Sequence, residues 1–192
     1  MNNPNPLFKM TLAELWQLFP IVLTEHNPDW QDWYKEEKAN LQQHLPTADV
    51  VRISHIGSTA VGGIWAKPIV DILLEVQQGA DLMMIKQAIE QAGYLCMSET
   101  TNRLSFNKGY TVKGFAKKVF HLHLRYVGDN DELYFRDYLQ THDAVAQEYE
   151  QLKKSLWQLY PNDRDTYTEH KTGFVKCYTA KAKEMFARRY DK

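Results

Sequence analysis

Residues 55–76, HIGSTAVGGIWAKPIVDILLEV, place a Gly-Ser pair ahead of an aspartate that stands inside a run of aliphatic residues. The segment 67–76 is nearly all apolar, which is typical of a strand covered on both faces. An ionised carboxylate buried in such a strand is costly unless it is paired or binds a metal. Because strand side chains alternate, Asp71, Leu73 and Glu75 share one face. We therefore predict a site at Asp71, with Glu75 as a second, more distant carboxylate.

The Gly57-Ser58 pair is a candidate phosphate-binding turn. Glycine lets the main chain approach a ligand closely, and the residues after it can begin a helix whose N–H groups face an anion. Lys67 follows in the loop before the acidic strand, where it would contact the same ligand. Two alternatives stay open: a tight turn with a capping serine, and a solvated loop lysine.

The periodicity of the whole chain predicts an α+β fold, a mixed sheet of four or five strands flanked by helices. We predict one domain, with an N-terminal helical extension (1–20), a core (21–130) and a helical C-terminal part (131–192). The predicted helices are 11–19, 29–45, 80–93, 131–142, 143–160 and 165–190. The predicted strands are 49–57, 67–76, 94–98, 103–110 and 118–127, with a short strand and turn in 21–30 and a basic loop in 111–117.

Composition excludes several function classes. The chain has 192 residues, is 44% hydrophobic and contains no run of about 20 apolar residues that could cross a bilayer. Its beginning lacks the pattern of a signal peptide, so we expect a cytoplasmic protein. A net charge of -1 argues against an extended nucleic-acid-binding surface. Cys96 and Cys177 form no CxxC pair, and we expect both to be buried thiols.

The remaining candidates follow residue 118. His121, His123 and Arg125 share one face of a predicted strand, and two imidazoles at this spacing can bind a metal or an anion. The alternative is a hydrogen-bonded pair of histidines. We expect Arg125 to hold phosphates as well. Arg136 and Lys171 lie on predicted helices and could hold phosphates too, or instead form salt bridges.

A Gly-Ser turn, a short spacer and an aspartate-bearing strand resemble the signature of polymerase-beta-type nucleotidyltransferases. More closely, the chain is similar to the GrpB family, a branch of that superfamily. The segments that carry the resemblance occur in the family's order and are NPDWQDWYKEEKANL (27–41), HIGSTAV (55–61), AKPIVDILLEV (66–76), FHLHLR (120–125), FRDYLQTH (135–142) and DRDTYTEHKTGFV (163–175).

The resemblance implies a mixed nucleotidyltransferase sheet that binds a nucleoside triphosphate and transfers its nucleotidyl group to an unidentified acceptor. It implies that Gly57 and Ser58 approach the phosphates and that Asp71 binds a divalent metal, magnesium or manganese rather than zinc. The chain departs from the superfamily at Leu73, where active enzymes carry a second aspartate. Two alternatives stay open: a noncatalytic nucleotide- or phosphate-binding module, and a metal-dependent hydrolase with Asp71, His121 and His123 as ligands.

Overall fold

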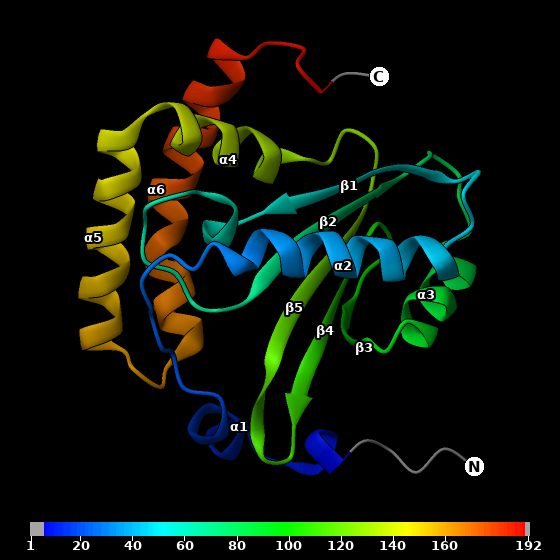
Figure 1. Cartoon of the computed structure of the whole chain (residues 1–192), viewed down its shortest axis with the longest axis horizontal. Helices are drawn as coiled ribbons and strands as arrows, with labels where there is room; N and C mark the ends of the chain where they lie inside the picture. The colour runs from blue at the N-terminus through cyan, green and yellow to red at the C-terminus, as the bar shows by residue number, and fades with distance from the viewer. Residues whose placement is uncertain (1–5, 191–192) are drawn as a thin grey trace.

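The computed structural model describes residues 6–190, in which six α-helices and five strands follow one another along the chain (Figure 1). The helices are α1 (Leu12–Leu18), α2 (Asp29–His44), α3 (Leu82–Gln91), α4 (Asp131–Thr141), α5 (Asp143–Leu159) and α6 (Arg164–Met185). The strands are β1 (Val50–Ile56), β2 (Val70–Val76), β3 (Leu95–Glu99), β4 (Arg103–Thr111) and β5 (Gly114–Tyr126). Short 3₁₀ turns are η1 (Pro6–Lys9) and η2 (Ser58–Ala60). Within these residues, no helix has the length and apolar character that a membrane span needs.

The strands form one mixed sheet in the order β1-β2-β5-β4-β3. β2 and β5 are parallel, while the pairs β1–β2, β4–β5 and β3–β4 are antiparallel. This arrangement confirms the predicted α+β class with a helical C-terminal region. The strand after the Gly-Ser turn lies between the strand before it and the strand with the two histidines.

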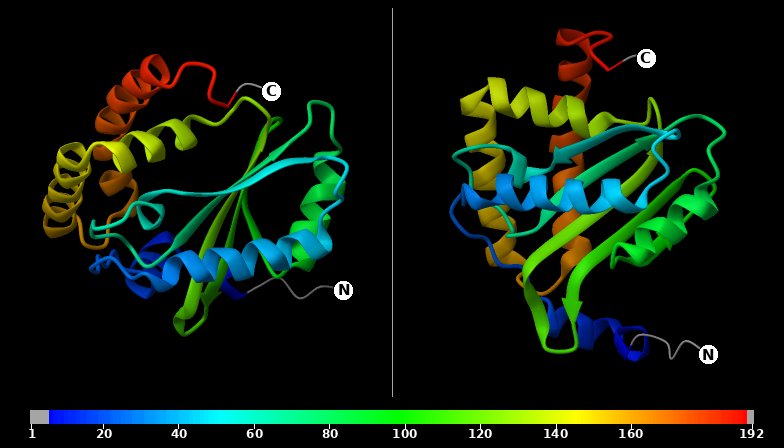
Figure 2. Two further views of the ribbon diagram at one scale, coloured as in Figure 1. Left: turned by 45° about the horizontal axis from the view of Figure 1, so that its top comes forward. Right: turned by 45° about the vertical axis from the view of Figure 1, so that its right-hand side comes forward.

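The two faces of the sheet are covered by different helices (Figure 2). The main core lies between the sheet and α2 and α3, where Ile72, Leu74 and Leu122 pack with Trp30 and Ile85. These strand residues alternate with those of the opposite face. On that opposite face, β1 and β2 pack against α4 through a small cluster of Ile56, Leu73 and Leu133, and α5 and α6 pack beside α4. The polar residues of β2 and β5 therefore face the helical C-terminal part.

Three local predictions were wrong. Residues 21–30 do not enter the sheet, because Thr24 forms only an isolated bridge with Ala66 in the loop before β2. The predicted loop 111–117 is mostly strand, since a left-handed Gly114 (φ +100°) closes a tight hairpin. Cys96 is half-buried and Cys177 is exposed.

Candidate functional site

The turn after β1 lies directly against the acidic strand. Gly57 adopts a left-handed conformation (φ +71°), and a Cβ atom there would lie 2.3 Å from Oδ2 of Asp71. Ile56 pairs with Asp71 across β1 and β2, so the chain turns immediately above this carboxylate. A side chain at residue 57 would collide with Asp71, which is why glycine is required here. Ser58 then begins the short helix η2.

Asp71 is paired with the two histidines of β5. The parallel register places Asp71 opposite His121 and Leu73 opposite His123. Oδ1 of Asp71 lies 3.2 Å from Nδ1 of His121 and 3.9 Å from Nε2 of His123. Burial alone would raise the pKa of Asp71, but the hydrogen bond with His121 and the nearby imidazole of His123 lower this pKa far below its ordinary value. Asp71 is therefore a carboxylate that stays ionised at neutral pH.

His121 belongs to a longer chain of hydrogen bonds. Its other ring nitrogen, Nε2, lies 2.8 Å from the hydroxyl of Tyr110 on β4, and Arg164 of α6 donates to this hydroxyl at 3.1 Å. Burial lowers the pKa of His121, although Asp71 opposes this shift. A neutral His121 would donate from Nδ1 to Asp71 and accept at Nε2 from Tyr110. Both ring nitrogens are thus engaged.

Three lysines from separate segments face the same site. Lys67 comes from the loop before β2, Lys153 from α5 and Lys171 from α6. Burial lowers the pKa of Lys67 to about 7 and that of Lys153 to about 7, and in both cases the charge of Lys171 lowers the pKa further. Burial likewise lowers the pKa of Lys171 to about 8. Mutual repulsion and burial both disfavour the charged forms of these lysines. A bound anion would offset both effects, so the site favours an anion.

These groups line one cavity of about 590 Å³ between the sheet and the helices α5 and α6. The cavity brings together seven of the residues that the sequence singles out, namely Gly57, Ser58, Lys67, Asp71, His121, His123 and Lys171. Lys153 and Arg164 add two further cations. The carboxylates among the lining residues are Asp71 and Asp165, so cationic side chains outnumber carboxylates.

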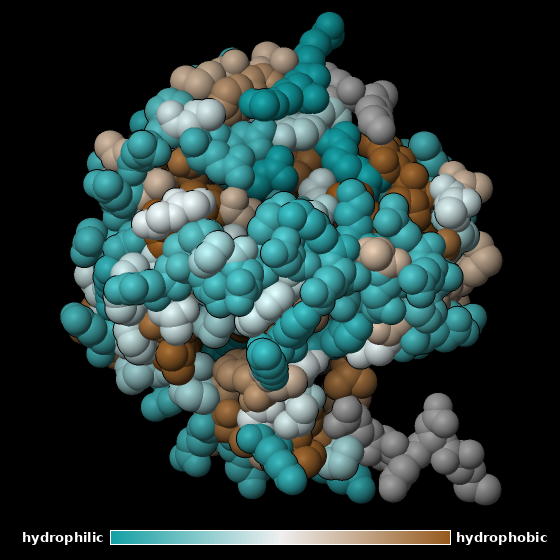
Figure 3. Space-filling view, viewed as in Figure 1, coloured by the Kyte–Doolittle hydropathy of each residue, from teal (hydrophilic) through white to brown (hydrophobic). Residues whose placement is uncertain are grey.

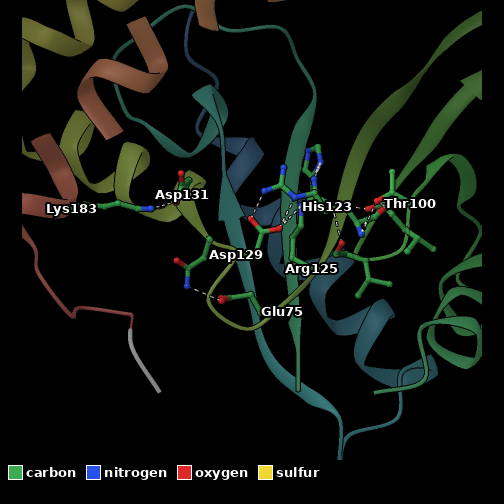
Figure 4. Close-up of polar contacts among 11 residues, drawn as sticks. Glu75, Thr100, His123, Arg125, Asp129, Asp131 and Lys183 are labelled. Atoms are coloured by element: carbon green, nitrogen blue, oxygen red, sulfur yellow. Dashed lines mark hydrogen bonds and ion pairs between the residues drawn. The ribbon is translucent and has the colours of Figure 1, made fainter. Parts of the chain in front are cut away.

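Two of the other predicted residues, Glu75 and Arg125, are engaged in polar contacts with neighbouring residues (Figure 4). Glu75 is fully buried, accepts a hydrogen bond from Asn130 at 2.9 Å and forms an ion pair with Arg52 at 3.3 Å. Arg125 donates to the main-chain oxygen atoms of Leu104 and Leu124. Neither residue lines the cavity, and both hold β2 or β5 to neighbouring segments.

Arg136 also lies apart from the cavity. It donates to the main-chain oxygen of His55 at 2.8 Å and to the carboxylate of Asp137 at 2.6 Å. It also donates to the hydroxyl of Tyr190. This is the salt-bridge alternative that the sequence left open, and it ties α4 to β1 and to the chain after α6.

The donor set does not fit the metal ions that the resemblance implies. Among residues 6–190, no group of three or more His, Cys, Asp or Glu side chains is placed to hold a metal ion. Asp71, His121 and His123 do converge, but both nitrogens of His121 already make hydrogen bonds, and Leu73 stands where a second carboxylate would be needed for two metal ions. The positive charge of the site comes from lysine and arginine.

Sequence reasoning missed Tyr110, Lys153 and Arg164. A signal for Lys153 was present, because it falls on the buried stripe of α5 that includes Ala146, Tyr149 and Leu156. A lysine in such a stripe is unusual unless it is paired or functional. Tyr110 gave no such signal, since its contact with His121 depends on the pairing of β4 with β5.

Comparisons with known proteins agree with the resemblance to GrpB. The model of the family described as GrpB protein matches residues 20–181. A glutamate-rich protein GrpB of Alkalihalophilus pseudofirmus is 35% identical over 161 residues, which cover 81% of this chain and 91% of that protein. The crystal structure of the conserved protein GrpB from Enterococcus faecalis superposes with a TM-score of 0.74 at 30% identity, covering 86% of this chain and 99% of that one.

A more distant likeness is to the Cid1 poly(U) polymerase in its MgGTP-bound crystal structure. The TM-score is 0.47 at 10% identity, over 76% of this chain and 46% of that chain. This likeness is too weak to assign a role to any residue.

Proposed function

This chain belongs to the GrpB family, and we propose that its cavity binds the phosphates of a nucleoside triphosphate. The observation that carries the proposal is the convergence of Lys67, Lys153, Lys171 and Arg164 on one cavity beside the Gly57 turn. Lys153 is buried, and Lys67 and Lys171 are half-buried. Lysines gathered in this way repel one another and lose their protons readily, so the arrangement is costly without an anion. A polyphosphate would offset that cost.

The same geometry favours binding over two-metal nucleotidyl transfer. Asp71 is the carboxylate that faces the two histidines, and it is already paired with them. The lysines and Arg164 supply the charge that metal ions supply to phosphates in many transferases. We therefore propose binding that needs no divalent cation, which is the binding-module alternative. The donor set gives no specific support to a metal-dependent hydrolase.

The test is titration calorimetry with inorganic tripolyphosphate and with ATP, each in buffer containing EDTA. Lys67→Ala and Lys171→Ala should each weaken tripolyphosphate binding by about 10- to 100-fold, because a charged hydrogen bond contributes about 1.5–3 kcal/mol. Ser58→Ala should weaken it less. Lys176→Ala is the matched control, since Lys176 is exposed on the same helix and does not line the cavity.

Two results would refute the proposal. One is the absence of tripolyphosphate and ATP binding by the wild-type protein. The other is equal loss of affinity in Lys171→Ala and Lys176→Ala. Binding that appears only when magnesium or manganese is added would refute the metal-free form of the proposal and return Asp71 to the role of metal ligand.

A further inference from the structure

The cavity has a second, apolar end that phosphate binding leaves unexplained. The N-terminal segment contributes Leu7, Phe8, Leu12, Leu15, Trp16 and Phe19 to its wall. Leu95 and Met97 of β3 line the same end. In Figure 1, α1 lies at the end of the molecule where the β4–β5 hairpin turns. This segment precedes residues 20–181, which match the family model.

Part of this apolar wall is open to solvent. Phe8 is 57% exposed, Leu12 is 54% exposed and Met97 is 49% exposed. Figure 3 shows a mostly hydrophilic surface over α2, whereas apolar atoms gather below it, at the end that carries the hairpin. Apolar side chains that line a hollow and stay exposed gain free energy when a ligand covers them.

The wall is anchored to the polar end of the site. The ring of Phe19 packs against that of Tyr110 at 4.7 Å between centroids and against that of Phe115 at 5.0 Å. Thr11 and Glu14 form a capping box at the beginning of α1. Because Tyr110 also contacts His121, these contacts connect the N-terminal segment to the cationic end.

A polar group that can recognise a planar ligand lies between the two ends. Asn107 of β4 pairs with His121 of β5 and lines the cavity. Its side-chain amide makes no hydrogen bond within the part of the chain that the structure describes, and it can both donate and accept. Trp16 and Phe8, which line the same cavity, offer aromatic rings. An acyl chain would leave this amide unsatisfied, whereas a heteroaromatic ring would stack on the aromatic residues and pair with the amide.

We propose that the N-terminal segment and Asn107 form a subsite for a nucleobase, so that the ligand of the cavity is a nucleotide bound at both ends. This inference rests on the proposed phosphate site and adds the part of the ligand that the lysines do not contact. Contacts of the nucleobase with this subsite add to the affinity that the phosphates provide.

The test compares ATP, UTP and inorganic tripolyphosphate by calorimetry in EDTA, for the wild type, Trp16→Ala, Trp16→Phe and Asn107→Ala. The wild type should bind at least one nucleotide more tightly than tripolyphosphate. Trp16→Ala should reduce that advantage by about 5- to 100-fold, as expected for loss of a stacking ring, and leave tripolyphosphate affinity unchanged. Trp16→Phe should retain much of the nucleotide's advantage in affinity over tripolyphosphate. Asn107→Ala should also reduce the advantage and narrow the difference between ATP and UTP.

Trp33→Ala is the control, because Trp33 is a half-buried tryptophan of α2 on the opposite face of the sheet. Equal wild-type affinities for tripolyphosphate and both nucleotides would overturn the nucleobase subsite and leave the phosphate site intact. Retention of the full nucleotide advantage in Trp16→Ala and Asn107→Ala would do the same. Absence of binding by all three compounds would overturn both proposals.

Discussion

Asp71 shows how the partners of one carboxylate decide between two roles. A metal ligand would lose its function on replacement by asparagine, and the metal-free protein would gain stability from removal of an unpaired buried charge. In the structure, however, Asp71 makes a hydrogen bond with His121 and lies near His123, and both contacts lower its pKa. A carboxylate with a lowered pKa contributes stability above its unfolded pKa and loses this contribution as the pH falls through the folded value.

We therefore predict that Asp71→Asn lowers the melting temperature at pH 7 in metal-free buffer by about 2–10 °C. The affinity for tripolyphosphate should stay the same or increase, since a negative charge leaves the cavity. Differential scanning calorimetry and titration calorimetry measure the two effects. Asp165→Asn is the control, because Asp165 is an exposed carboxylate at the same cavity. A higher melting temperature in metal-free buffer, together with loss of binding measured in the presence of magnesium, would instead identify Asp71 as a metal ligand.

The contact of Asp71 with the histidines could be predicted from sequence. Alternation places Asp71 on one face of its strand and His121 and His123 on one face of theirs, and a mixed sheet brings those strands together. Glu75 shares the face of Asp71, yet it is buried beyond the cavity. Whether a residue on this face lines the cavity depends on where the helices cover the strand. Strand periodicity predicts the face of Glu75 but not the placement of those helices.

At the scale of elements, α5 holds the loop that carries Lys67. Oε2 of Glu150 accepts a hydrogen bond from the main-chain N–H of Trp65 at 2.7 Å. Lys153 donates to the main-chain oxygen of the same Trp65. Lys154 lies over the indole ring, 4.2 Å from its centroid. α5 thus holds the main-chain N–H, the main-chain oxygen and the ring of Trp65, two residues before Lys67.

This arrangement makes Glu150 a positioning residue for the phosphate site. We predict that Glu150→Ala weakens tripolyphosphate binding by about 3- to 10-fold and increases amide exchange of residues 62–67, because a buried main-chain N–H loses its partner. Glu148→Ala is the matched control, since Glu148 is on the same helix and contacts Tyr178 instead. Faster exchange in the loop with unchanged affinity would show that the loop's position does not matter for binding.

Helices with a clear periodicity of apolar residues could be predicted from the sequence. The extent of segments that depend on strand pairing could not. The apolar stripes of α3 and α5 and the cap of α1 mark those helices in the sequence. The extent of the β4–β5 hairpin depends on Gly109 and Gly114, whose left-handed conformations let a polar, basic segment stay paired. Thr24 stays outside the sheet because its main chain pairs with Ala66 instead.

At the scale of the whole molecule, charge is unevenly distributed. The chain carries a net charge of -1, yet its cavity is lined by more cations than carboxylates. The net charge argued against an extended basic surface, but it could not locate this site, because the lysines of the site come from a loop, α5 and α6. Packing the helical C-terminal part against the sheet brings them together, so their titration reports on both folding and ligand binding.

We predict opposite pH dependences for stability and for binding between pH 7 and pH 9. Lysines whose pKa values in the folded protein are lowered to about 7 or 8 are protonated in the unfolded chain up to about pH 10.4. The unfolded state therefore binds more protons, and these residues make the ligand-free protein more stable as the pH rises. A polyphosphate favours the protonated lysines, so its binding takes up protons. Tripolyphosphate affinity should fall about 10-fold or more from pH 7 to pH 9, although the ligand itself only gains negative charge over this range. Thermal denaturation and calorimetry in buffers of different ionisation enthalpy measure both slopes and the proton uptake.

In Lys67→Met the protein should be more stable than the wild type at pH 7, and this difference should shrink toward pH 9, whereas Lys176→Met should follow the wild type. Affinity that stays constant to pH 9, with no proton uptake, would mean that the lysines keep ordinary pKa values and that burial in the cavity does not control their charge.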